Sequence, residues 1–204
     1  MKNGYTLLGV LAILFWSSTI GFSRQLTEQL GVLTAGSIIH TAAGSLGLAV
    51  MAARGGKPHF SKLMRLPRHY LLGCGALMVT YIILLYLALG GAQNHAQVLV
   101  VGLINYLWSV LTLLFSLSVL GNKANVWLPV GCLVGLLGIG MAVFGGQELT
   151  WSDLRGAWLP YLMALAAAVC WSLYTNLAKR WLGETDTNGV VLFLLAGGLS
   201  LGVL

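Results

Sequence analysis

The residues best suited to bind a small molecule form a polar stripe inside a long apolar run. This run extends from Ala96 to Leu120 and contains no charged residue. At about 100° per residue, its small and polar side chains share one helical face. They are Gly102, Asn105, Ser109, Thr112 and Ser116, with Trp108 on one flank and Tyr106 on the other. The chemistry that such groups offer is non-covalent recognition, by hydrogen bonding and by stacking of the indole on a planar ring.

A polar stripe on a membrane helix must face protein or a water-filled cavity, because hydrocarbon cannot satisfy its hydrogen bonds. Two interpretations stay open for each Ser or Thr. The hydroxyl can bond its own helix backbone and serve in helix packing, or it can contribute to a binding site. For the whole stripe beside Trp108 we favour the wall of a central cavity.

Further candidates lie in other apolar runs. Tyr81 falls in the middle of a predicted span, where its hydroxyl needs a partner. His40 is the one histidine inside a predicted span, and a lone histidine is more often a packing residue than a ligand. No second His or Cys stands at metal spacing beside it, so we expect no metal and no cofactor.

The composition predicts a polytopic membrane protein that is entirely helical. The 204 residues are 58% hydrophobic and only 8% charged, whereas soluble domains carry roughly 25% charged residues. The net charge of +6 is therefore no sign of nucleic-acid binding, and the expected partners are the lipid bilayer and a small molecule. The oligomeric state stays open.

The chain has six apolar runs of spanning length and the start of a seventh. A helix needs about 20 residues to cross the bilayer. The predicted spans are Tyr5–Phe22, Val32–Ala53, Tyr70–Gly91, Ala96–Leu120, Val126–Gly145 and Ala157–Leu177, with the seventh starting at Gly189. Small residues recur at helical spacing in the second and fifth spans, and we expect those faces to point into the bundle.

The basic residues predict the orientation. Arg24 and Arg155 fall on one side of the predicted membrane, and the other nine Lys and Arg residues fall on the opposite side, five of them in a predicted loop from Arg54 to His69. Positively charged segments stay in the cytoplasm. This places the N-terminus in the cytoplasm, with the chain in a bacterial inner membrane.

Two spans share a short motif. Ala12–Ser17 and Ala167–Ser172 both contain Trp-Ser, and each Trp is followed eight positions later by a basic residue. Five predicted spans precede the second copy, so the two copies cross in opposite directions, as in the inverted repeats of transporters. We expect a first repeat over residues 1–146 and the start of a second over 157–204. The chain stops inside its seventh span at Leu204, which predicts a partial sequence or a truncated product.

With these residues, the chain resembles the drug/metabolite transporter superfamily, which has paired five-helix EamA-type repeats. The block Gly102–Trp108 followed by Leu111-Thr112, together with Trp16-Ser17-Ser18, Tyr81 and Trp171, resembles the YddG-like aromatic amino acid exporters. The family usually has proline after the Trp of this block, where this chain has Ser109, so the resemblance leaves the bend of this helix open.

The resemblance implies ten spans and export of aromatic amino acids. It carries the substrate-binding positions over to Tyr81, Asn105, Trp108 and Trp171, and we add Ser109, Thr112 and His40 from the residue patterns above. All five acidic residues fall in loops or at span ends, so no proton relay or catalytic pair is expected inside the membrane. The missing proton relay favours facilitated export over a multidrug antiporter that depends on a buried Glu, and the missing catalytic pair argues against an enzyme. A transporter of another substrate, such as a drug, sugar conjugate or purine, and a non-transporting fragment stay open as alternatives.

Overall fold

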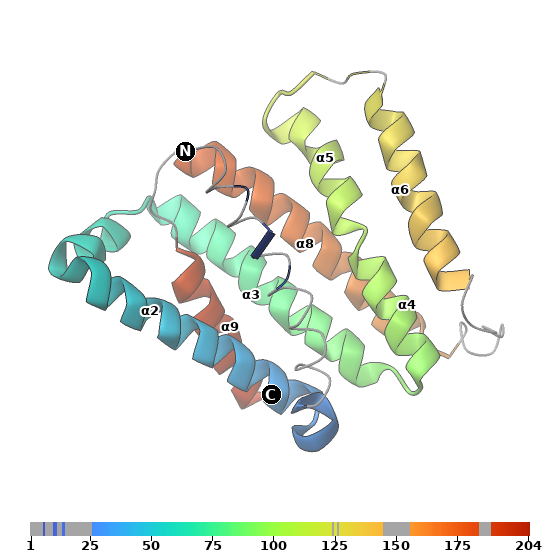
Figure 1. Ribbon diagram of the computed structural model, residues 1–204, viewed down its shortest axis with the longest axis horizontal. Coiled ribbons are helices and arrows are strands. Elements are labelled where there is room, and N and C mark those ends of the chain that lie inside the picture. Colours follow the sequence, from blue (N-terminus) through green and yellow to red (C-terminus); the bar gives the residue numbers. More distant parts are fainter. Residues whose placement is uncertain are drawn as a thin grey trace.

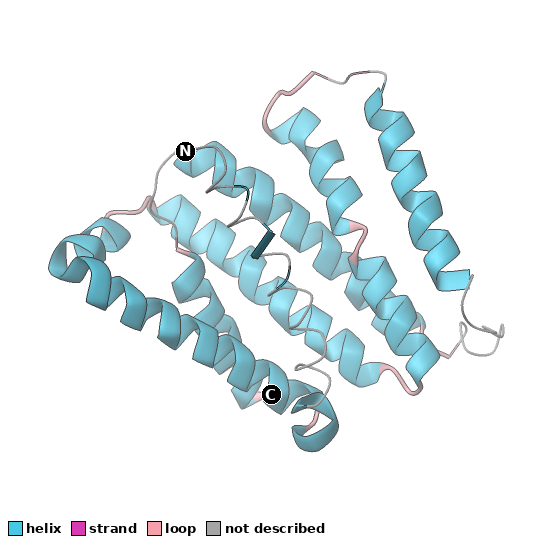
Figure 2. Cartoon of the chain, viewed as in Figure 1, coloured by secondary structure: helices cyan, strands magenta, loops and turns pink. Residues whose placement is uncertain are grey.

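Helices account for all the regular structure that the computed structural model describes (Figure 2). The described residues are 6, 10–11, 14, 26–123, 125, 127–144, 156–183 and 189–204. The helices named in Figure 1 are α2 (Val32–Met64), α3 (Arg68–Gly91), α4 (His95–Asn105), α5 (Trp108–Val119), α6 (Trp127–Phe144), α8 (Trp158–Leu182) and α9 (Val190–Val203). The all-helical prediction is confirmed for these residues. Most of the predicted first span, including Trp16, lies outside them.

Four of the described helical stretches are long and apolar enough to cross a membrane. They are Val32–Ala53, Arg68–Gly91, His95–Val119 and Trp158–Leu182. The bounds of the first agree with the predicted second span. The apolar helices Trp127–Gly138 and Val190–Val203 are shorter. The chain is therefore a multi-pass membrane protein.

The predicted loop from Arg54 to His69 is wrong for most of its length. Helix α2 continues to Met64 and only the turn from Arg65 to Pro67 separates it from α3. Basic side chains exclude this segment from the hydrocarbon, but they do not prevent helix formation, since Lys and Arg have good helix propensity. The helix ends before Pro67, because proline disfavours helical geometry in the residue that precedes it. Helix α8 likewise runs five residues past the predicted end at Leu177.

Helix α3 lies in the middle of the bundle (Figure 1). On one side α8 packs along it, and α4 and α5 pack on α8. On the other side α9 packs along both α3 and α2. Helix α6 lies at the outer edge against α4 and α5. The segments after residue 157 thus pack directly against those before residue 120.

Small residues allow α2 and α9 to approach closely. A Cβ atom added to Gly44 would lie 2.5 Å from Leu195, and one added to Gly198 would lie 2.5 Å from the backbone nitrogen of Thr41. These contacts confirm that small residues of the second span face into the bundle. The fifth span agrees only at Gly135, where an added Cβ would lie 3.7 Å from Val110 of α5, whereas Gly131 and Gly138 have no neighbouring atoms within 4 Å. Helix α6 presents these last two glycines to open space at the edge of the described bundle.

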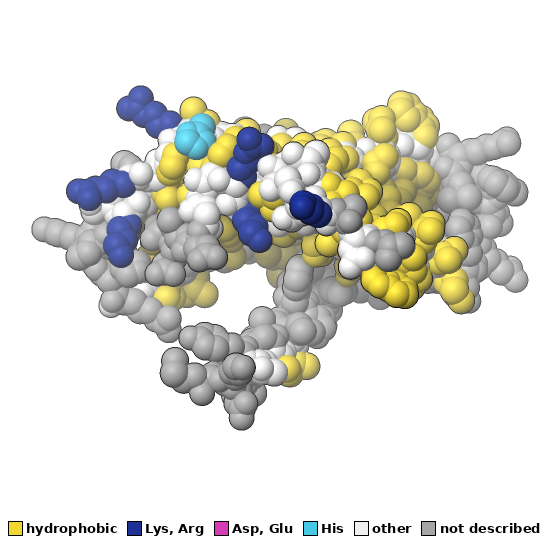
Figure 3. All heavy atoms as spheres, turned by 90° about the horizontal axis from the view of Figure 1, so that it is seen from above, with side chains coloured by type: hydrophobic (Ala, Val, Ile, Leu, Met, Phe, Trp, Pro, Cys, Tyr) yellow, Lys and Arg dark blue, Asp and Glu magenta, His cyan; other side chains and the backbone are white. Residues whose placement is uncertain are grey.

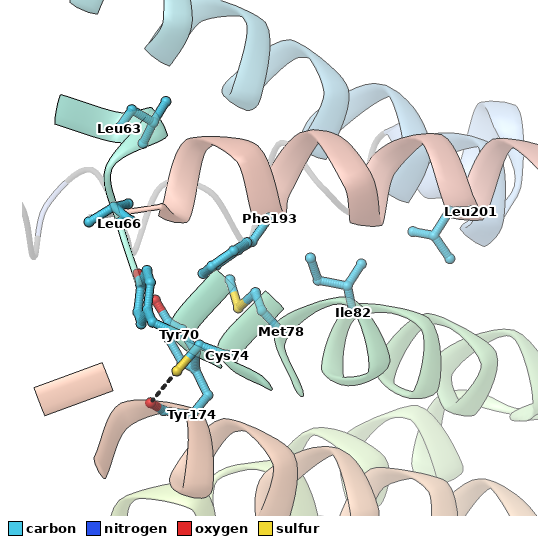
Figure 4. Packing of buried hydrophobic residues seen from close by; sticks show 9 residues of the cluster. All are labelled: Leu63, Leu66, Tyr70, Cys74, Met78, Ile82, Tyr174, Phe193 and Leu201. Atoms are coloured by element: carbon cyan, nitrogen blue, oxygen red, sulfur yellow. Dashed lines mark hydrogen bonds between the residues drawn. The ribbon is translucent and has the colours of Figure 1, made fainter. Parts of the chain in front are cut away.

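The largest apolar core joins α3, α8 and α9 (Figure 4). Phe193 reaches from α9 toward Tyr70 and Met78 of α3, and the Cys74 thiol lies 4.0 Å from the carbonyl oxygen of Tyr174 on α8. All these residues are less than a tenth exposed. A dense core at this junction fixes how α8 lies on α3, which in turn sets the positions of the aromatic residues described next.

Candidate functional site

Three aromatic side chains from different helices meet beside this core. The Tyr81 ring on α3 lies 4.8 Å from the Trp171 ring on α8, between ring centroids. The Trp108 ring on α5 lies 6.1 Å from Trp171, close to edge-on, with 67° between the ring planes. Such spacings are those of favourable aromatic pairs. We call Tyr81, Trp108 and Trp171 the aromatic cluster. The structure brings together three residues that lie up to 90 positions apart in the sequence.

The ring contacts continue from the aromatic cluster toward α9. Trp171 contacts Tyr174, with 5.7 Å between ring centroids, and Tyr174 contacts Phe193 at 6.3 Å. Phe193 then lies 5.5 Å from Tyr70, whose hydroxyl accepts a hydrogen bond from the backbone N–H of Gly189. Sequence reasoning missed this extension. Its one signal was Tyr174, placed one helical turn after Trp171 in an otherwise apolar span.

The predicted fourth span is interrupted beside the aromatic cluster. Helix α4 ends at Asn105 and α5 begins at Trp108, with a turn at Tyr106 and Leu107. The N–H groups of Leu107 and Ser109 bond the carbonyls three residues before them, at 3.1 and 3.2 Å, instead of four. The span tightens here without a proline, because hydrogen bonds of this kind wind the backbone more closely than an α-helix. Irregular backbone within a membrane span is typical of transporter binding sites.

Asn105 ends α4 with its amide beside the Tyr81 hydroxyl. The Oδ1 atom is buried and accepts no hydrogen bond from any described residue. An unpaired buried acceptor costs about 1–3 kcal/mol. Asn105 is thus a half-buried residue whose buried Oδ1 atom is an unused acceptor beside Tyr81 of the aromatic cluster, which suits a polar group of a ligand.

The hydroxyls of the predicted polar stripe bond their own helix. Ser109 Oγ donates to the Tyr106 carbonyl at 2.9 Å, Thr112 Oγ1 to the Trp108 carbonyl at 2.6 Å, and Ser116 Oγ to the Leu113 carbonyl at 2.7 Å. The Ser109 side chain is exposed on the surface of the described chain. The turn at residues 106–107 also separates Gly102 and Asn105 from the later members of the stripe. Of the stripe, Asn105 is the member that lies against the aromatic cluster.

His40 lies elsewhere in the bundle. Its Nδ1 atom is 2.9 Å from the Gly36 carbonyl oxygen of the same helix, and its ring meets Tyr86 edge-on at 5.4 Å. The described rings that His40 contacts do not include those of the aromatic cluster. Among the described residues, His40 thus approaches the aromatic cluster only through Tyr86, which lies near Tyr81 on α3.

Two buried polar residues that the sequence analysis did not single out join α8 to α5. Ser172 Oγ lies 2.9 Å from the Trp108 carbonyl oxygen, and Asn176 Nδ2 lies 3.0 Å from the Thr112 carbonyl oxygen. Both side chains are almost fully buried, at 0% and 2% exposure. Their spacing of four residues in an apolar span was an available signal, because it places two polar groups on one helical face.

Comparison with known protein families identifies the family of this chain. A sequence profile of the EamA-like transporter family matches residues 3–144. The chain belongs to the EamA-like transporter family. Membership in a transporter family agrees with a multi-pass helical bundle whose polar and aromatic groups meet in its interior, and it makes a small molecule the expected class of ligand.

Several curated proteins and one solved structure resemble this EamA-like chain over nearly all of its length. The aromatic amino acid exporter YddG of Escherichia coli K12 is 32% identical over 202 residues, which cover 97% of this chain and 66% of the exporter. The protein of the same name from Salmonella typhimurium is 32% identical over 96% of this chain and 65% of its own length. A crystal structure with 29% identity superposes with a TM-score of 0.70 and matches 97% of this chain and 64% of its own chain. This chain thus spans about two thirds of the length of these relatives.

The described basic residues of the EamA-like chain gather at one end of the bundle. Arg180, near the end of α8, donates to the Val119 carbonyl at the end of α5, and the neighbouring Trp181 ring meets His69 at the start of α3. The end of α2 is joined to α3 at the same place. Figure 3 shows Lys and Arg side chains spread over this end. The residues are Lys62, Arg65, Arg68, Lys123, Lys179 and Arg180.

Among the described residues, no group of three or more His, Cys, Asp or Glu side chains lies close enough together to hold a metal ion. The described acidic residue nearest to a span is Glu28, which precedes α2. The groups that the structure brings together in the interior are aromatic rings, amides and hydroxyls. Such groups can stack on a planar ring and hydrogen-bond polar atoms.

Proposed function

We propose that the protein exports aromatic amino acids across the bacterial inner membrane. The observation that carries the proposal is the aromatic cluster of Tyr81, Trp108 and Trp171, which three helices supply next to an interrupted span. The relatives named aromatic amino acid exporters support the same substrate class. Indole and phenol rings stack on the ring of Phe, Tyr or Trp, and their faces attract an ammonium group, at about 0.5–2 kcal/mol per contact.

In this proposal Asn105 recognises the polar end of the substrate. Its buried Oδ1 atom has an unused lone pair, which would accept a hydrogen bond from the substrate ammonium group. The ring of the substrate would then lie against Trp108 and Trp171, on the other side of the Tyr81 hydroxyl. The assignment of Ser109, Thr112 and His40 to the same site has weaker support, because the hydroxyls bond their own helix and His40 pairs with Tyr86.

The wider architecture in this proposal is a ten-span transporter built from inverted repeats, 1–146 and from 157 onward, that works by alternating access. The packing of α8 and α9 onto α2 to α5 supports it, since binding at the junction of two repeats requires both repeats to contribute side chains. The basic end of the bundle would face the cytoplasm, together with the N-terminus. Export would be facilitated, because the interior groups include no acidic residue among those described.

The test measures binding and export in parallel. Purified protein is titrated with Phe, Tyr, Trp, Leu and Lys, and export of the same amino acids is followed from cells that express the complete gene. We expect Trp108→Ala and Trp171→Ala each to weaken binding of aromatic amino acids by several-fold, since one stacking contact contributes about 1 kcal/mol.

Exposed tryptophans provide the matched control. Trp127 and Trp158 are 72% and 66% exposed, so Trp127→Ala and Trp158→Ala remove the same side chain far from the aromatic cluster and should leave binding unchanged. Equal affinities for Phe, Leu and Lys in the unmodified protein, or full aromatic binding by both cluster variants at normal yield, would contradict the proposal. A dye or purine that binds while aromatic amino acids do not would favour the alternative substrate class.

A further inference from the structure

The interrupted fourth span raises the question of what holds Trp108 in place. Trp108 is the first residue of α5, directly after the turn at Tyr106 and Leu107. Because two N–H groups at this turn bond carbonyls three residues away, α4 and α5 are not one continuous α-helix. The position of Trp108 therefore depends on how α5 is attached to its neighbours, and less on α4.

Helix α8 attaches to α5 through a row of three hydrogen-bond donors. Ser172, Asn176 and Arg180 are spaced four residues apart, so they share one face of α8. Each donates to a different carbonyl of α5: Ser172 to Trp108, Asn176 to Thr112 and Arg180 to Val119, at 2.9, 3.0 and 3.1 Å. The three donors thus bond α5 from its first residue, Trp108, to its last residue, Val119.

Asn176 makes the most complete of these attachments. Its two amide hydrogens serve two acceptors, the Thr112 carbonyl on α5 and the Ser172 carbonyl on α8, at 3.0 and 2.9 Å. Both partners are acceptors, so the orientation of the amide is determined by the bonds themselves. Ser172 shares its single hydroxyl hydrogen between Trp108 and the Ala168 carbonyl, 2.6 Å away on its own helix.

These bonds act directly on the aromatic cluster. Ser172 follows Trp171 in the sequence and bonds the backbone of Trp108, so it links the two residues whose rings lie 6.1 Å apart. A shift of α5 along α8 by one residue, about 1.5 Å, would carry both carbonyls away from their donors and move the Trp108 ring by the same distance. Between α4 and α8, Val101 and Ala164 make an apolar contact.

We infer that Ser172 and Asn176 are positioning residues that fix the register of α5 on α8 and so hold Trp108 against Trp171 for substrate stacking. The inference rests on the proposed function for its substrate, while the register itself is a property of the unliganded protein. Membrane helices associate without a hydrophobic driving force, so interhelical hydrogen bonds of this kind contribute to the arrangement that the helices adopt. Arg180 strengthens the same register at the basic end.

The test separates register from transport by observing Trp108 directly. Protein labelled with 5-fluorotryptophan is studied by fluorine NMR, with the signals of Trp108 and Trp171 assigned through Trp→Phe variants. Ser172→Ala and Asn176→Leu should shift or broaden the Trp108 signal and leave the signals of Trp127 and Trp158 in place. Each should also weaken binding of Phe or Trp by about threefold, as a typical interhelical hydrogen bond in a membrane protein implies.

Thr175→Val is the matched control. The Thr175 hydroxyl is on the same helix but donates to the Trp171 carbonyl of α8 itself, at 2.9 Å, so its loss should leave the Trp108 signal unchanged. Ser172→Ala removes a single oxygen atom and keeps the test available if Asn176→Leu does not fold. An unchanged Trp108 signal and unchanged affinity in both variants, with or without a lower melting temperature, would overturn the inference. A shifted Trp108 signal in a protein that binds no aromatic amino acid would instead support the register and overturn the proposed function.

Discussion

At the scale of single residues, Asn105 combines burial with an unused acceptor. Its amide lies beside the Tyr81 hydroxyl while Oδ1 has no hydrogen bond from a described residue. Proteins rarely leave such an atom unpaired, because the lost solvation costs free energy that the fold must offset. The Asn105 side chain interacts with Tyr81, whose ring contacts Trp171. The free-energy cost of the unpaired Oδ1 atom in the unliganded protein would therefore favour binding of a hydrogen-bond donor beside the aromatic cluster.

Asn105→Leu should therefore separate stability from binding. Leucine has nearly the same volume and no polar atom, so the variant should gain about 1 kcal/mol in free energy of unfolding, or about 2–4 °C in melting temperature, when no ligand is present. It should lose most of its affinity for aromatic amino acids. Melting curves with and without Phe measure both effects. A lower melting temperature without ligand would mean that Oδ1 already has a partner, and the assigned role of Asn105 would be wrong.

At the scale of elements, the turn between α4 and α5 tightens the predicted fourth span without a proline. The Ser109 N–H bonds the Tyr106 carbonyl at 3.2 Å, and its hydroxyl donates to the same carbonyl at 2.9 Å. Ser109 is the second residue of α5 and thus lies in its first turn. The first turn of a helix is where proline is tolerated, because its N–H groups have no partner four residues back within the helix.

Ser109→Pro should consequently be tolerated, although it falls within a membrane span. We expect a loss of less than about 1 kcal/mol in free energy of unfolding, and unchanged binding of aromatic amino acids. Leu113→Pro, five residues into α5 and also exposed, is the control and should cost about 3 kcal/mol or more. Thermal unfolding in detergent compares the two. Equal destabilisation would show that α5 continues α4 as a regular helix through residue 109.

At the scale of the whole molecule, the basic end of the bundle defines a direction in the membrane. The turn between α2 and α3 and the ends of α5 and α8 meet there, while the turn between α3 and α4 lies at the other end of α3. Because positively charged segments tend to stay in the cytoplasm, we predict that the basic end is the cytoplasmic one. A helix of 24 residues such as α3 is about 36 Å long, enough to place its two ends on opposite sides.

Cysteine labelling in intact cells tests this direction. In a background with Cys74, Cys132 and Cys170 replaced by alanine, Gln93→Cys should react with a membrane-impermeant maleimide, and Ser61→Cys should react only after permeabilisation. Both positions are exposed on the chain surface, so access to the reagent depends on the side of the membrane. Gln93 is preferred over Asn94, whose side chain accepts a hydrogen bond from Gln97 at the start of α4. The reverse pattern would invert the orientation of the whole protein.

The sequence by itself determined the class of the protein and the extent of most described spans, because the hydrocarbon demands long apolar helices. Tyr81 and Trp108 were candidates from their positions in apolar runs, whereas Trp171 was named from the repeat and the family resemblance. The extension of α2 to Met64 was not predicted. Lys and Arg residues indicate where a span leaves the hydrocarbon, but they do not indicate where the helix ends, because both residues have good helix propensity.

Only the tertiary structure decided which polar side chains lie beside the aromatic cluster and which hydrogen-bond to backbone carbonyls. Helical spacing placed Asn105, Ser109 and Thr112 on one face, but the turn at residues 106–107 changes the phase of the helix between them. The roles of Ser172 and Asn176 emerged in the same way, because their acceptors are backbone carbonyls of another helix. A carbonyl is present at every residue and leaves no mark in a sequence, so a bond between a side chain and a distant backbone becomes visible only when the helices are packed.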